Sequence, residues 1–108
     1  MGTIPNWFLN GIVQARTAQN DEKFWEMGNA LARNANACLQ DADQDAEAAA
    51  DELRCIWRDH QGADDGRRCA VEAWLNRRLS AYVQLVPARF RKSFVDGFIP
   101  LMDDEPTL

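Results

Sequence analysis

The sequence predicts an all-α protein with a single domain. Apolar residues recur at spacings of three and four along most of the 108-residue chain, which is the period of one helix face. No alternating β-branched run is long enough for a strand, and no solenoid repeat or low-complexity linker divides the chain. We therefore expect four to five helices over residues 1–102, followed by a mobile acidic tail over residues 103–108.

The first expected helix is short and lies near the N-terminus. Gly11 weakens it, because glycine is a poor helix former. Its apolar residues are Trp7, Phe8, Leu9, Ile12 and Val13.

The longest helical stretch is expected between residues 20 and 60, which hold no proline and one glycine. Asn20 or Asp21 is placed to cap it. Its small side chains let a second helix approach closely. After residue 42 the apolar pattern shifts by four, which is typical of a stutter. The resulting small-residue face consists of Phe24, Gly28, Leu31, Ala35, Cys38 and Ala42, then Ala46, Ala49, Leu53, Ile56 and His60.

The length of this stretch conflicts with a compact monomer. One helix of 41 residues would be about 60 Å long, whereas a domain of this size has a radius of gyration near ~13 Å. Either the helix breaks, near residues 34–36 or 41–45, or a second copy of the chain covers it. We expect one long Ala-rich helix and a homodimer built on it.

A helical hairpin is predicted around residues 61–66. Gly62 is placed to end the long helix, and Asp64 or Asp65 to cap the next one. That second helix ends at Pro87, which opens a short helix ended by Gly97. The apolar face of the second helix is Val71, Leu75, Leu79, Tyr82 and Val86.

Composition argues against an enzyme. A chain this short has little room for both a core and a deep catalytic cavity. His60 is the sole histidine, and no Ser, Cys or Thr lies in an activating motif. We expect no catalytic residue and no cofactor.

Location in the cytoplasm is expected on two grounds. No apolar run approaches the ~20 residues of a membrane span, and no export signal is recognisable. Three cysteines, Cys38, Cys55 and Cys69, are an odd number that fits reduced thiols.

Residues 41–52 resemble an EF-hand calcium loop. Asp41, Asp43, Asp45 and Glu52 stand at loop positions one, three, five and twelve, where the resemblance implies oxygen ligands. Ala46, however, replaces the glycine needed at position six. A single calcium site at residues 41–52 remains one alternative function. The other interpretation of these carboxylates is an acidic, solvated helix face.

Cys55, His60 and Cys69, with the more distant Cys38, are side chains of the kinds that bind zinc. No two of these residues are two to four apart, as the common zinc sites require. Buried thiols at a helix interface are the simpler interpretation, and no metal site is predicted.

Charge divides the chain into two halves. Residues 17–53 hold nine acidic and two basic residues, whereas residues 54–92 hold nine basic and four acidic ones. Arg67, Arg78 and Arg89 are spaced by eleven, which would align them on one side of a straight helix, although Pro87 interrupts it. The basic face of residues 67–92 makes nucleic-acid binding an alternative function, although the net charge of −5 opposes it.

Protein binding is the predicted function. Opposed charges orient partners, and Trp, Tyr and Arg are enriched at binding hot spots. In size, charge and helical content the chain resembles small bacterial anti-activators of the TraM and QslA type, which sequester quorum-sensing transcription factors of the LuxR type. The resemblance implies a regulator that inhibits a partner protein, such as a transcription regulator. The predicted partner-binding residues are Trp7, Phe8, Leu9, Trp74, Arg78, Tyr82, Phe90 and Phe94.

Overall fold

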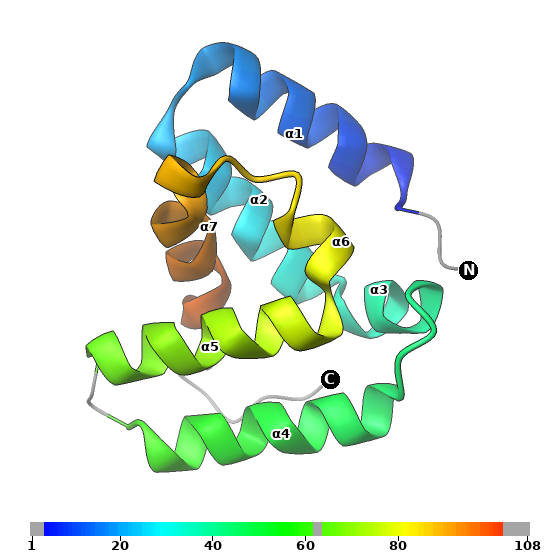
Figure 1. Ribbon diagram of the computed structural model, residues 1–108, viewed down its shortest axis with the longest axis vertical. Coiled ribbons are helices and arrows are strands. Elements are labelled where there is room, and N and C mark those ends of the chain that lie inside the picture. Colours follow the sequence, from blue (N-terminus) through cyan, green and yellow to red (C-terminus); the bar gives the residue numbers. More distant parts are fainter. Residues whose placement is uncertain (1–3, 62–63, 103–108) are drawn as a thin grey trace.

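The computed structural model describes residues 4–61 and 64–102, and within these ranges the chain is all-helical with no strand (Figure 1). No helix in this part of the chain is long and apolar enough to cross a membrane. The described elements exceed the four to five expected, because both long predicted helices are interrupted. They are α1 (Asn6–Ala18), α2 (Asp21–Arg33), α3 (Ala35–Asp41), α4 (Ala46–Asp59), α5 (Asp64–Arg78), α6 (Ser80–Val83), the 3-10 helix η1 (Ala88–Phe90), α7 (Arg91–Phe98) and the 3-10 helix η2 (Ile99–Met102).

The first helix is longer than its sequence suggested. Gly11 does not interrupt α1, and the backbone there lies beside the side chain of Met27 on α2. The helix ends where Gln19 adopts a left-handed conformation with a φ of 49°. Its buried face consists of Phe8, Ile12 and Ala15.

The single Ala-rich helix over residues 20–60 is not formed. Asn34 interrupts it, and the chain turns again at residues 42–45, where Asp43 has a φ of 57°. Asp45 then caps α4, because its Oδ1 accepts hydrogen bonds from the backbone N–H groups of Glu47 and Ala48, each at 3.1 Å. The chain thus breaks at both of the places that its sequence offered.

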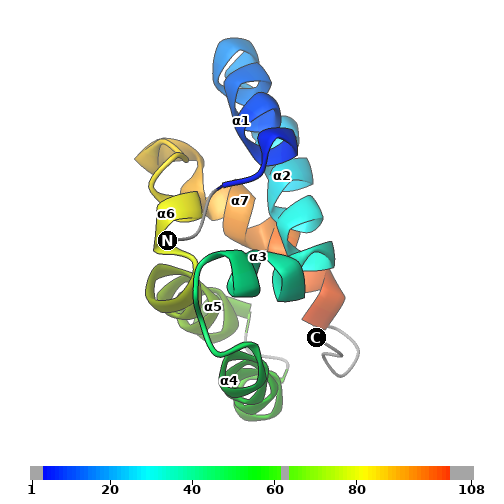
Figure 2. The ribbon, with the colours of Figure 1, turned by 90° about the vertical axis from the view of Figure 1, so that its right-hand side faces the viewer.

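These breaks remove the reason for expecting a second copy. The radius of gyration is 12.9 Å, which matches the ~13 Å of a compact domain with about this many residues. Figures 1 and 2 show α4 and α5 side by side at one end, α1 and α2 at the other, and α3 between them.

The small-residue face packs against other helices of the same chain, where the sequence predicted close helix packing and we expected a second copy to cover it. Turning the chain at Asn34 and at residues 42–45 keeps one face of three successive helices against the core. Its buried members include Phe24, Gly28, Leu31, Ala35, Cys38, Ala49 and Leu53.

Helices α2 and α7 cross in close contact and run antiparallel. A Cβ at Gly28 would overlap the backbone carbonyl of Phe94, and a Cβ at Gly97 would overlap that of Trp25. The buried Asn29 joins the two helices, since its Nδ2 donates to the carbonyl oxygen of Gly97 at 3.1 Å. Gly97 therefore lies inside α7 and permits this approach, and the prediction that it ends the helix is wrong.

The predicted hairpin is formed by α4 and α5, although its second helix is shorter than expected. It ends at Arg78, and Leu79 leaves the helical conformation before α6 begins. Pro87 caps η1 and is not its first residue. The turn residue Gly62 and the acidic tail over residues 103–108 lie outside the described residues.

Candidate protein-binding surface

Five of the eight predicted partner-binding residues lie in the core. They pack with other aromatic residues: the rings of Phe8 and Tyr82 are 4.9 Å apart, and Trp74 lies 5.6 Å from Phe98. Helices α1, α6 and α7 converge there, so that aromatic area is removed from water. The expectation of an exposed aromatic face therefore fails for the five buried residues, which are Phe8, Trp74, Tyr82, Phe90 and Phe94.

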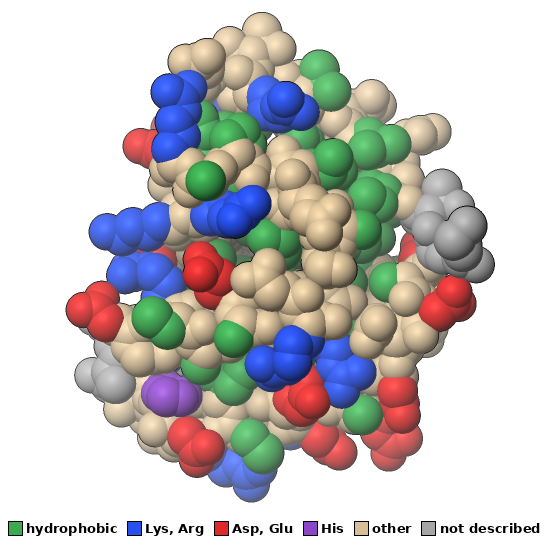
Figure 3. Space-filling view, viewed as in Figure 1, with side chains coloured by type: hydrophobic (Ala, Val, Ile, Leu, Met, Phe, Trp, Pro, Cys, Tyr) green, Lys and Arg blue, Asp and Glu red, His purple; other side chains and the backbone are tan. Residues whose placement is uncertain are grey.

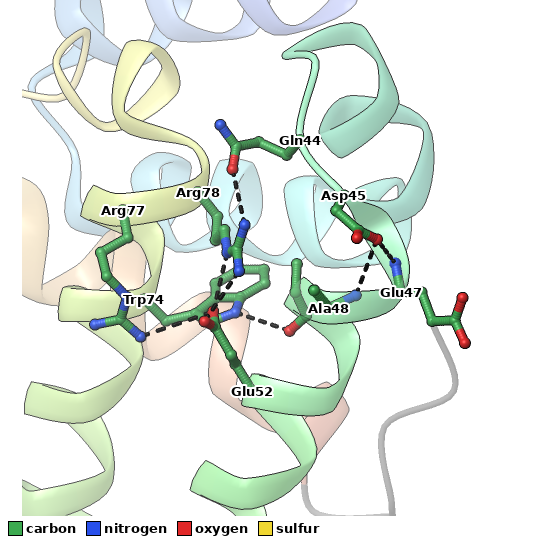
Figure 4. A network of polar contacts seen from close by, with 9 residues as sticks. Gln44, Asp45, Glu47, Ala48, Glu52, Trp74, Arg77 and Arg78 are labelled. Carbon is green, nitrogen blue, oxygen red and sulfur yellow. Dashed lines mark hydrogen bonds and ion pairs between the residues drawn. The ribbon is translucent and has the colours of Figure 1, made fainter.

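The guanidinium of Arg78 is held by hydrogen bonds to side chains of the same chain (Figure 4). Its Nε and Nη2 donate to the two carboxylate oxygens of Glu52, both at 2.9 Å, and its Nη1 donates to Gln44 at 3.0 Å. The hydrogen bond from Arg78 lowers the pKa of Glu52. Close by, the indole N–H of Trp74 donates to the carbonyl oxygen of Ala49 at 3.0 Å. Both Trp74 and Arg78 thus hold α5 against α4.

The two oppositely charged halves also meet within the chain. Glu52 belongs to the acidic half and Arg78 to the basic half. Elsewhere, Arg68 of the basic half pairs with Asp96, which lies outside both halves, the Nε of Arg68 being 2.7 Å from the carboxylate. Arg67, Arg78 and Arg89 do not share one straight helix, because α5 ends at Arg78 and Pro87 precedes η1.

The backbone of residues 41–52 does not form the loop that the resemblance to an EF-hand implies. Positions six to twelve lie in α4, Asp45 caps that helix, and Glu52 pairs with Arg78. These residues cannot curl around one cation.

Burial raises the pKa of the Cys38 thiol, which disfavours the thiolate that a metal needs. Cys55 and Cys69 are exposed, and no group of metal-binding side chains is found in the described residues.

Exposed apolar side chains remain on α1. Leu9 is 38% exposed and Val13 is 62% exposed. Residues four apart lie on one side of a helix, and Arg16 continues that side one turn later. Trp7, 39% exposed, lies on another side of α1. Figure 3 shows hydrophobic side chains gathered over α1 with Lys and Arg beside them, whereas Asp and Glu are more frequent over the opposite end of the molecule.

A groove of about 460 Å³ adjoins this side of α1. The last turn of α1 forms one wall, and the segment entering η1 forms the other. The guanidinium of Arg89 lies 4.7 Å from the centroid of the Phe90 ring. We call this feature the α1 groove; it is lined by Val13, Arg16, Thr17, Gln19, Pro87, Arg89 and Phe90.

Two smaller cavities of about 270 Å³ each lie elsewhere. One contains Arg78, which is already bound to Glu52. The other places the exposed Trp25 near Asp96, which is already paired with Arg68. The α1 groove differs from both, because neither Arg16 nor Arg89 has an ion-pair partner among the described residues.

The sequence pointed to Trp7 and Leu9, which are exposed, but assigned no binding role to Val13 or Arg16. A usable signal existed: residues 1–20 and 73–95 contain no acidic residue, although the chain has seventeen. Comparisons with models of protein families, with curated proteins and with solved structures found no match to this chain.

Proposed function

We propose that this protein is a non-enzymatic regulator that binds another protein through α1. We define the α1 surface as Leu9, Val13 and the α1 groove. The observation that carries the proposal is the 62% exposure of Val13. It sits one turn after Leu9 and opens directly onto the groove. Apolar side chains on one side of a helix beside a groove are typical of protein recognition sites.

The proposed mechanism is steric. When a partner binds α1, the part of the partner that contacts α1 is blocked. The partner needs this blocked surface for its own dimerisation or for contact with nucleic acid. The resemblance to anti-activators suggests a transcription regulator as that partner. The protein would act in the cytoplasm, where its three free cysteines stay reduced.

The chemistry of the groove supports binding over catalysis. Its polar side chains are Arg16, Thr17, Gln19 and Arg89. Arginine remains protonated, so this set includes no general base.

Nucleic-acid binding through the basic face of residues 67–92 loses support, because Arg68 and Arg78 are held in ion pairs. No second copy of the chain is needed for the proposed contact.

The test is affinity capture from a bacterial lysate with three tagged proteins: the unaltered chain, the double variant Leu9→Ser/Val13→Ser and the control Trp25→Ser. Trp25 is also an exposed apolar residue, at 39%, but lies on α2. Circular dichroism first establishes that all three are folded. We expect a protein that the unaltered chain and the control retain and that the α1 double variant loses. Equal retention by the double variant would refute a contact through α1.

A further inference from the structure

None of the described residues that line the α1 groove is acidic. All seven lining residues come from residues 1–20 and 73–95, which contain no Asp or Glu. The rest of the chain supplies all seventeen carboxylates. The net negative charge of the chain repels an anionic partner from the molecule as a whole. The groove, with no acidic residue in its described lining, repels that partner least.

Two guanidiniums flank apolar lining in this groove. Arg16 projects from the last turn of α1, and Arg89 from η1. The contact with the Phe90 ring restricts Arg89, so that less freedom is lost when it binds a carboxylate. Val13 and Pro87 supply apolar lining between these charges. The site thus offers hydrophobic contact together with two positive charges that have no ion-pair partner in the part of the chain that the structure describes.

We propose that the α1 groove receives an acidic amphipathic segment of the partner protein. An apolar side chain of that segment packs against Val13 and Pro87, while its carboxylates pair with Arg16 and Arg89. This inference rests on the proposed function and specifies the chemistry of the partner. A nucleic-acid strand fits less well, because affinity for phosphates depends on many cationic contacts and the groove provides two.

The pairing has a measurable consequence. Both guanidiniums lie at the surface, where salt screens charge over about 10 Å at 0.1 M ionic strength. Binding of the segment therefore weakens as salt is raised. The apolar contact is not screened, so a residual affinity remains at high salt.

The experiment uses a synthetic labelled peptide of about 15 residues, with Leu on one helix face and Glu on the other. Fluorescence anisotropy measures its binding to the full chain, to Arg16→Ser/Arg89→Ser and to the control Lys23→Ser/Arg33→Ser. The control changes net charge equally, but its two residues lie on α2. A peptide with Gln in place of Glu and a labelled single-stranded oligonucleotide serve as comparison probes.

We expect the acidic peptide to bind the unaltered chain and the control equally, and the groove variant about five- to tenfold more weakly. The Gln peptide should also bind more weakly. Equal binding to the groove variant, equal binding of the Gln peptide, or no binding at about millimolar peptide would overturn the inference. Tighter binding of the oligonucleotide would overturn it in favour of nucleic acid. If capture from the lysate still depends on Leu9 and Val13, any of these results leaves the proposed function standing.

Discussion

Gly28 and Gly97 are the residues at which α2 and α7 make backbone contact. Replacing either with alanine places a Cβ against a backbone carbonyl, which cannot move as a side chain can. We expect Gly28→Ala and Gly97→Ala each to lower the free energy of unfolding by about 1–3 kcal/mol or more. Gly11→Ala is the matched control, because its Cβ meets only the flexible side chain of Met27. The control should be neutral or stabilise by up to ~1 kcal/mol. Urea denaturation measures all three, and a Gly28 variant as stable as the control would contradict the close crossing.

Glu52 makes the stability depend on pH. The hydrogen bond from Arg78 lowers its folded-state pKa, so the ionised carboxylate stabilises the fold at neutral pH. This contribution is present above the ordinary pKa of glutamate and is lost as pH falls through the lowered pKa. Because the Glu52 side chain is 38% exposed, the ionised carboxylate contributes about 1 kcal/mol or less to the free energy of unfolding. The unaltered chain should exceed Glu52→Gln in free energy of unfolding at pH 7 and lose that advantage in acid. In an Arg78→Gln background this pH-dependent difference should shrink to the part that Arg77, with its Nη2 3.9 Å from Glu52, still supplies, and an undiminished difference would show that another group causes it.

The sequence could separate some exposed residues from buried ones. The spacing of Phe8, Ile12 and Ala15 marks the buried face of α1 and leaves Leu9 and Val13 outside it. Phe94 could not be assigned in this way, whereas Tyr82 belongs to the apolar face that spacing marks on the second predicted helix. Their burial arises where α6 and α7 meet Phe8 of α1, a contact between segments far apart in the chain.

At the scale of the element, local sequence offered two explanations of residues 20–60, and the helix breaks at both candidate places. Alanine favours a continuous helix, whereas Asn34 and Asp45 favour interruption. Asp45 accepts two backbone hydrogen bonds at the start of α4. We expect Asp45→Ala to cost about 1 kcal/mol of stability, and Asp45→Asn to cost little, since asparagine caps as well as aspartate. Chemical denaturation measures both. An Asn variant as damaged as the Ala variant would assign the role to the carboxylate charge, and the capping explanation would fail.

The two sides of α1 should respond differently to substitution. Ile12 is 2% exposed, whereas Val13 is 62% exposed. Ile12→Ala should lower the free energy of unfolding by about 2–5 kcal/mol, and Val13→Ser should change it by about 0.5 kcal/mol or less. Thermal unfolding distinguishes these values. A large loss with Val13→Ser would mean that this side of α1 is already covered in the isolated protein.

At the scale of the whole molecule, the sequence predicted the all-helical class, the hairpin and close helix packing on the small-residue face. Local pattern could not predict the compact shape, because that depends on which helices meet. The 41-residue stretch folds back within extents of 36 × 31 × 19 Å. The acidic and basic halves of the chain pair across α4 and α5. The α1 groove, whose described lining residues include no Asp or Glu, is therefore the distinct surface.

The contact through α1 is tested most directly by amide hydrogen exchange of the chain, alone and bound to the protein it captures. Exchange slows where a partner covers backbone and stabilises its hydrogen bonds. We expect slower exchange over residues 6–19 and 87–90, with little change in α4. Protection confined to α4 and α5, with none in α1, would contradict the account.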